Sequence, residues 1–118
     1  MRKIKFRVWD DIDYMSKPFT LSDLQLGAMK FTSDCQVMQF TGFQDKNGSE
    51  IYEGDIIEKD DDKFTRTGVV SFIHGCWMVA NKDGDARFNL HYYMKQVEVI
   101  GNIHENPELL GGATNGKD

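Results

Sequence analysis

Turn-forming sequences divide this chain into many short apolar segments, and that division limits the folds open to it. Eleven glycines and two prolines are spread over 118 residues. The apolar runs between them are short, and several alternate with polar residues. Short alternating runs bounded by turn residues are typical of half-buried β-strands rather than of long amphipathic helices. The sequence therefore predicts a mostly β domain.

The predicted strands share this alternation and are separated by a few strong turns. We expect extended segments at residues 3–9, 12–15, 36–40, 51–57, 67–73, 76–80 and 97–103. Asn47-Gly48 is the strongest turn signal, because Asn-Gly readily supplies the two positive φ values of a type I′ turn. Thr41-Gly42 is expected to end the strand before it. One short helix is predicted within residues 89–95, and a second has Asn106 as its N-cap and Pro107 in its first turn.

The spacing of the later strands predicts a small barrel. Gly54–Ile57, Gly68–Val70 and Gly75 resemble the strand–turn pattern of SH3-like barrels, in which glycine permits the bulges that turn sharp corners. We predict a β-rich α+β fold, a partly open SH3-like barrel with an N-terminal strand or hairpin and one or two short helices. Residues 1–110 form one domain with the barrel core at 51–103, and residues 111–118 form a disordered tail.

Hydropathy and net charge disfavour several classes of protein. No apolar run approaches the ~20 residues that span a bilayer. Charges recur too early in the N-terminal segment for a secretory signal, so we expect a cytoplasmic protein without a membrane partner. Fourteen Lys and Arg against nineteen Asp and Glu give a net charge of -5 and a pI near 5.1. This balance disfavours nucleic acid as a partner, because nucleic-acid-binding domains usually have more basic than acidic residues.

The charges are nevertheless segregated along the sequence. Four cations lie in or directly before the first predicted strand: Arg2, Lys3, Lys5 and Arg7. Residues 50–62 contain seven acids and one lysine. One interpretation is a basic edge strand and a solvated acidic loop. The other is a self-complementary or head-to-tail contact between the two regions. The same four cations, with Trp9 beside them, could also form the groove of a nucleic-acid-binding barrel.

No metal or cofactor is predicted. Cys35 and Cys76 match no metal spacing, and Cys76 lies in an apolar run that predicts a reduced thiol in the core. The three histidines lack a cysteine or carboxylate at ligand spacing. Asp45–Ser49 and Asn81–Asp85 begin like calcium loops but lack the glycine and glutamate that such loops need, so both are predicted to be turns. The sequence contains no phosphate loop and no dinucleotide fingerprint.

Glu53, Asp55 and Glu58 are spaced two and three residues apart near the start of a predicted strand, but we predict no catalytic residue. Glu53 and Asp55 are close enough in sequence for the acid–base pair of a small hydrolase. That hypothesis needs a concave pocket around both carboxylates. The favoured interpretation is that Gly54-Asp55 forms a turn or bulge in which Asp55 accepts backbone N–H bonds.

Large aromatic residues and a histidine are the candidates for partner binding. Aromatic side chains supply contact area at low entropic cost and concentrate at interaction hot spots. The candidates are Trp9, Trp77, His91, Tyr92 and Tyr93. Trp77 is also predicted as a core residue, and it shares one face of its predicted strand with Val79.

Three stretches resemble the YopX family of phage and prophage proteins. Phe40–Ile57 resembles the central motif of the family, Val99–Leu110 its C-terminal signature and Ile4–Asp10 its N-terminal strand. The motif positions that we single out are Asp45, Asn47, Gly48, Tyr52, Glu53, Gly54, Asp55, Gly101, Asn106 and Pro107. The resemblance implies a small β-rich phage or prophage protein that is oligomeric. It implies no activity.

The leading functional hypothesis is a non-enzymatic protein-interaction module in the cytoplasm of a bacterial host. Such a module would self-associate and bind a host or phage protein. A nucleic-acid-binding barrel that uses the basic N-terminal strand is the alternative, and a carboxylate-dependent hydrolase is the second alternative.

Overall fold

The computed structural model describes residues 4–10, 14–20, 22–23, 36–60 and 65–111. Its strands are β1 (Phe6–Asp10), β2 (Tyr14–Met15), β3 (Gln36–Gln44), β4 (Glu50–Tyr52), β5 (Asp55–Asp60), β6 (Thr65–Ile73), β7 (Cys76–Ala80), β8 (Ala86–Asn89) and β9 (Val97–Asn102). Its helices are α2 (Leu90–Tyr93), the 3-10 turn η1 (Met94–Gln96) and α3 (Glu108–Gly111). In this described part of the chain, no helix is long and apolar enough to cross a membrane.

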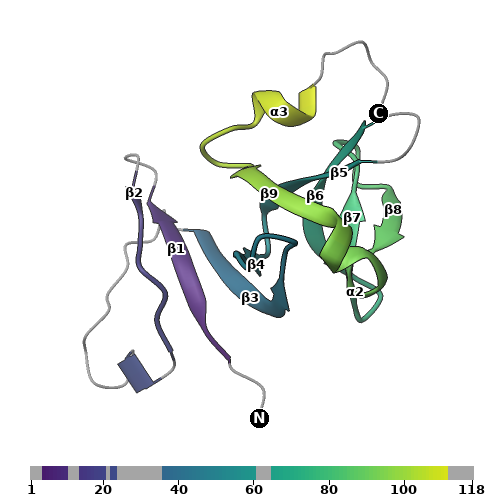
Figure 1. Ribbon diagram of the computed structural model, residues 1–118. Coiled ribbons are helices and arrows are strands. Elements are labelled where there is room, and N and C mark those ends of the chain that lie inside the picture. The colour runs from purple at the N-terminus through teal and green to yellow at the C-terminus, as the bar shows by residue number, and fades with distance from the viewer. Residues whose placement is uncertain (1–3, 11–13, 21, 24–35, 61–64, 112–118) are drawn as a thin grey trace.

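The strands form two antiparallel sheets that lie side by side (Figure 1). The first sheet has the order β2-β1-β3-β4 and the second has the order β8-β7-β6-β5-β9. The predicted mostly β class with short helices is therefore confirmed. β1 lies between β2 and β3, so the expectation that the basic strand is an edge strand is wrong. Arg2, Lys3, Cys35 and residues 112–118 lie outside the described residues.

The predicted barrel core at residues 51–103 is divided between the two sheets. β4 pairs with β3, with Tyr52 opposite Phe40, whereas β5 to β9 form the second sheet. β8 and β9 are the edges of the second sheet and are not paired with each other within the described residues. The segment is therefore not one closed sheet, because its first strand leaves to complete the other sheet.

Strand β4 links the two hydrophobic clusters because successive side chains of a strand point to opposite faces. Ile51 packs into a cluster of the second sheet with Ile57, Val70, Val79, Leu90 and Val97. Its neighbour Tyr52 packs into a smaller cluster of the first sheet with Met38 and Phe40. Two successive residues of β4 thus pack into the hydrophobic clusters of both sheets.

The two-residue turn of type I′ geometry occurs in a different hairpin from the predicted one. His74 and Gly75 have φ values of +51° and +81° and join Ile73 to its partner Cys76 across the β6–β7 hairpin. At the predicted position only Gly48 has a positive φ, +84°, so a type I′ turn at Asn47-Gly48 is wrong. The Asp45 carboxylate, which accepts from the backbone N–H groups of Asn47 and Ser49, stabilises that turn instead.

Three further local expectations are corrected. β3 does not end at Thr41-Gly42, because Gly42 has a φ of +91° and the register shifts there, so the strand bulges and continues. Cys76 is exposed rather than in the core, because it begins β7 beside the hairpin turn. The Asn106 side chain accepts from the Asn102 backbone N–H and does not cap α3.

Candidate functional site

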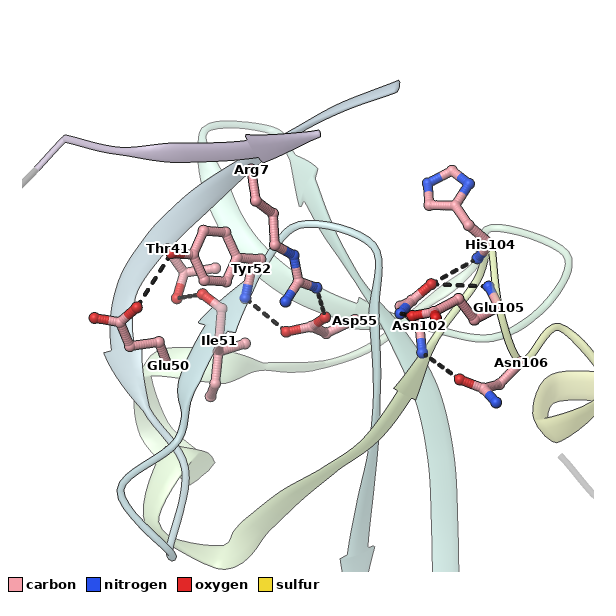
Figure 2. Close-up of polar contacts among 10 residues, drawn as sticks. All are labelled: Arg7, Thr41, Glu50, Ile51, Tyr52, Asp55, Asn102, His104, Glu105 and Asn106. Atoms are coloured by element: carbon pink, nitrogen blue, oxygen red, sulfur yellow. Dashed lines mark hydrogen bonds and ion pairs between the residues drawn. The ribbon is translucent and has the colours of Figure 1, made fainter. Parts of the chain in front are cut away.

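The central motif and the N-terminal strand meet in a buried ion pair (Figure 2). The Arg7 guanidinium donates to Asp55 Oδ1, and the second oxygen of Asp55 accepts from the Tyr52 backbone N–H at 2.8 Å. The Arg7 guanidinium also lies over the Tyr52 ring, 4.4 Å from its centroid. Asp55 is 1% exposed, so both of its oxygens are satisfied inside the protein. Asp55 accepts a backbone N–H as predicted, but the turn lies at Glu53-Gly54 and Asp55 begins β5.

Burial dominates the electrostatics of this pair. It raises the pKa of Asp55 from an ordinary value of 3.8 to about 6, while Arg7 acts in the opposite direction. Removing a carboxylate from water is expensive, and one cation does not fully compensate for it. The pair therefore fixes the geometry of the junction between the sheets without being a strong source of stability.

A second ion pair lies beside the first. Lys5 contacts Glu50 Oε2, and the Tyr52 hydroxyl donates to Glu50 Oε1 at 3.1 Å. The Lys5 ammonium lies 4.8 Å from the centroid of the Phe40 ring. Burial, with Glu50 adding to it, raises the pKa of Tyr52 above its usual range, so this phenol remains a hydrogen-bond donor.

These contacts show where the basic and acidic segments of the sequence meet. Lys5 and Arg7 pair with Glu50 and Asp55, so the basic strand and the acidic region meet within one chain. Two of the four cations of the predicted nucleic-acid patch, Lys5 and Arg7, are therefore paired with acids. The other two, Arg2 and Lys3, lie outside the described residues. The hydrolase hypothesis needs a concave pocket around the carboxylates of Asp55 and Glu53. Asp55 is instead buried, and the Glu53 backbone N–H donates to the Gln39 carbonyl oxygen.

Asp45 anchors its turn to the second sheet. One carboxylate oxygen accepts from the backbone N–H groups of Asn47 and Ser49, at 2.8 and 2.9 Å. The other accepts from the Val99 N–H of β9 at 2.9 Å. Asn81 repeats the local part of this arrangement by accepting from the N–H groups of the second and fourth residues after it. The prediction that both segments are turns is confirmed.

The C-terminal motif forms a compact polar loop after β9. Asn102 is buried, and its side-chain oxygen accepts from the backbone N–H groups of His104 and Glu105. Its side-chain NH2 group donates to the Glu105 carboxylate at 2.7 Å. Asn106 closes the loop, and Gly101 leaves room for it, because a Cβ there would lie 2.5 Å from the Asn106 side-chain oxygen. Figure 2 shows this loop beside the Arg7–Asp55 pair. Pro107 precedes α3 directly.

The predicted partner-binding aromatics fall into different environments. Trp9 is 7% exposed and stacks on His104 at a centroid distance of 5.9 Å, so it lies in the interior. Tyr92 is 74% exposed, and the neighbouring His91 ring contacts Phe43. Tyr93 is 36% exposed, and its ring meets Phe88 edge to face.

Trp77 has a partner that the sequence analysis missed. It is half-buried against the core of the second sheet, and its ring meets the edge of Phe72, with 4.9 Å between centroids. Phe72 lies directly opposite Trp77 in the β6–β7 register and is 56% exposed. The signal was present in the sequence, because the hairpin turn at His74-Gly75 places these two residues opposite each other.

Two crystal structures resemble this chain over most of its length. Protein EF1440 from Enterococcus faecalis has 25% sequence identity and a TM-score of 0.61, with 93% of this chain and 99% of that chain covered. YopX from Bacillus subtilis has 21% identity and a TM-score of 0.58, with coverage of 90% and 97%; this second likeness shows the fold alone. No curated protein matches the sequence. Residues 7–111 match the family described as YopX protein, and the chain therefore belongs to the YopX family.

Proposed function

We propose that the chain is a non-enzymatic protein-interaction module of the phage or prophage accessory type. It acts in the cytoplasm of a bacterial host and self-associates through the β6–β7 hairpin. The observation that carries this proposal is the aromatic pair of Phe72 and Trp77, with Phe72 56% exposed. An exposed phenylalanine on an otherwise core-facing side of a sheet favours burial against another protein.

The position of the pair supports self-association. Phe72 follows Val70 at the two-residue period of β6, so both side chains point to the same face. Val70 is in the core, whereas Phe72 extends beyond it. A second copy related by a two-fold axis would place the same rings against each other, as closed symmetric dimers do.

We also propose that the second sheet has an SH3-like, partly open arrangement. β5, β6, β7 and β8 follow one another as a meander, and after α2 and η1 the chain returns so that β9 pairs with β5. This connectivity supports an SH3-like, partly open arrangement of the second sheet. Such small β-rich scaffolds hold surface side chains in fixed positions, which suits recognition.

The enclosed polar groups support a non-enzymatic role. Asp55 is saturated by Arg7 and a backbone N–H, and Glu50 is held by Lys5 and Tyr52. A general acid or base must reach a substrate proton, and these groups reach each other instead. Their arrangement is that of a structural junction between the sheets.

Sedimentation velocity over a concentration series tests this proposal. The wild-type protein is expected to form a species heavier than the 13.6 kDa protomer. Phe72→Ser is expected to weaken that association by about tenfold or more, as loss of a buried aromatic contact does. Val37→Ser is the matched control, because Val37 is 50% exposed but lies on β3 in the first sheet. A protomer mass at every concentration, or equal effects of the two substitutions, would contradict the proposal.

A further inference from the structure

A basic cleft opens in the second sheet, and none of the residues that line it is one of the motif positions named above. Its volume is about 260 Å³, and it is lined by Lys59, Arg66, Arg87, Phe88 and Tyr93. Three cations therefore face one small cleft in a chain whose net charge is -5. The residues come from β5, β6, β8 and α2, so the cleft exists only in the folded protein.

The strand register concentrates the positive charge. Lys59 lies directly opposite Arg66 in the β5–β6 pair, so two like charges are neighbours across the strands, and a bound anion would reduce the repulsion between them. Arg87 joins them because of a register shift in β8. Phe88 pairs with Val79 and Ala86 with Ala80, so Arg87 has no opposite residue and occupies a bulge.

Burial makes this concentration more significant. Lys59 is only 8% exposed, and its ammonium lies 5.0 Å from the centroid of the Tyr93 ring. Fully buried lysines are rare unless they have charged partners. Lys59, Arg66 and Arg87 each make a further interaction within the chain, so an anion in the cleft would add to the partners that these cations already have.

Two aromatic rings form an apolar part of the cleft wall. Phe88 and Tyr93 meet edge to face at a centroid distance of 5.3 Å. Such a wall offers contact to an apolar or planar group attached to an anion. The small volume excludes a large ligand, since clefts for drug-sized molecules are about 300–1,000 Å³.

We propose that this cleft binds a small phosphate monoester. The phosphate group, which carries a charge of about -1.5 to -2 at neutral pH, contacts the three cations, and the group that it esterifies packs against Phe88 and Tyr93. Guanidinium groups suit this task because they bind phosphate oxygens in a bidentate manner. The site is independent of the proposed self-association, since Phe72 and Trp77 do not line it.

Isothermal titration of the full chain with phenyl phosphate, inorganic phosphate and phenol tests the proposal. Phenyl phosphate is expected to bind with one-to-one stoichiometry and more tightly than inorganic phosphate, and phenol is expected not to bind. Arg87→Gln and Arg66→Gln should each raise the Kd for phenyl phosphate by about tenfold or more. Lys82→Gln is the matched control, because it removes an exposed positive charge from the turn before β8 and should leave the Kd unchanged.

A further variant separates the two parts of the site. Tyr93→Leu is expected to reduce the preference for phenyl phosphate over inorganic phosphate while leaving the affinity for inorganic phosphate similar. Amide NMR spectra of each variant establish that it is folded. The proposal is overturned if folded wild-type protein does not bind phenyl phosphate, or if Lys82→Gln weakens binding as much as Arg87→Gln. Binding of a single-stranded oligonucleotide without binding of phenyl phosphate would also overturn it, in favour of a nucleic-acid surface.

Discussion

Arg7 on β1 donates to Asp55 at the start of β5, and this ion pair connects the first sheet to the second. The two residues are separated by 48 positions in the sequence. The Tyr52 ring lies under the guanidinium, and the Tyr52 backbone bonds the same carboxylate. The motif residues at this point therefore act together as a junction.

Replacing one partner of the pair should be strongly destabilising. At neutral pH, Arg7→Met is expected to lower the free energy of unfolding by about 3–5 kcal/mol, because it leaves the Asp55 carboxylate buried without a cation. The matched control is Lys46→Met, which removes an ion pair with Glu98 whose side chains are 40% and 43% exposed. That change should cost less than about 1 kcal/mol. Urea unfolding measures both, and similar costs would contradict a special role for Arg7.

The pH dependence of stability should report Asp55. Its pKa rises from 3.8 to about 6 on folding, so the folded state holds a proton that the unfolded state releases between these values. The stability from this proton is present below pH 3.8 and is lost as the pH rises through about 6. The advantage of wild type over Asp55→Asn in free energy of unfolding should therefore fall by about 3 kcal/mol across this range. Urea unfolding at several pH values measures it, and a constant difference would refute the assignment.

The turn around Asp45 should contribute more to the free energy of unfolding than the turn around Asn81. Asp45→Ala removes an acceptor of three backbone N–H groups, one of them in β9, and should cost about 3 kcal/mol. Asn81→Ala removes an acceptor of two N–H groups in an exposed turn and should cost about 1 kcal/mol. Thermal unfolding with calorimetry compares them. Equal costs would mean that the bond to Val99 contributes little.

Gly68 is required because two strands approach closely at its position. A Cβ there would lie 2.5 Å from Val79 Cγ1 and 2.8 Å from the Ala80 carbonyl oxygen. Gly68→Ala should therefore destabilise the protein by about 1–3 kcal/mol. Alanine at an unhindered strand position would instead stabilise the protein by roughly 0.5–1 kcal/mol, so the sign of the change in urea unfolding decides the matter. Thr67→Ala, on the opposite face of β6, serves as the control.

Local periodicity predicted the strands well, and pairing partners poorly. Alternation located β6 and β7. It could not show that β4 would leave the predicted barrel, because alternation marks an extended segment but not its partner, and β4 pairs as a hairpin with β3. Thr41-Gly42 likewise resembles a strand end locally, although β3 bulges there and continues. The hydrogen bond from the Thr41 hydroxyl to the Ile51 carbonyl, 2.8 Å long, depends on the neighbouring strand.

Prediction of the functional surfaces had a similar limit. Charge segregation indicated a contact between the basic strand and residues 50–62, but not that the contact would lie within one chain. The exposure of Phe72 depends on how far the core extends along β6, which no local pattern states. The basic cleft has no sequence motif, since Lys59 and Arg87 come together only through the register of the second sheet.

The long sequence separation of Arg7 and Asp55 has a consequence for synthesis on the ribosome. Arg7 is made before Asp55, so its guanidinium must wait until 48 further residues have been translated, which takes roughly 2–10 seconds. For most of that interval Arg7 lacks its Asp55 partner, and β4 has not joined the first sheet. Association of the nascent strand with a chaperone or a neighbouring chain would compete with folding most strongly in this period.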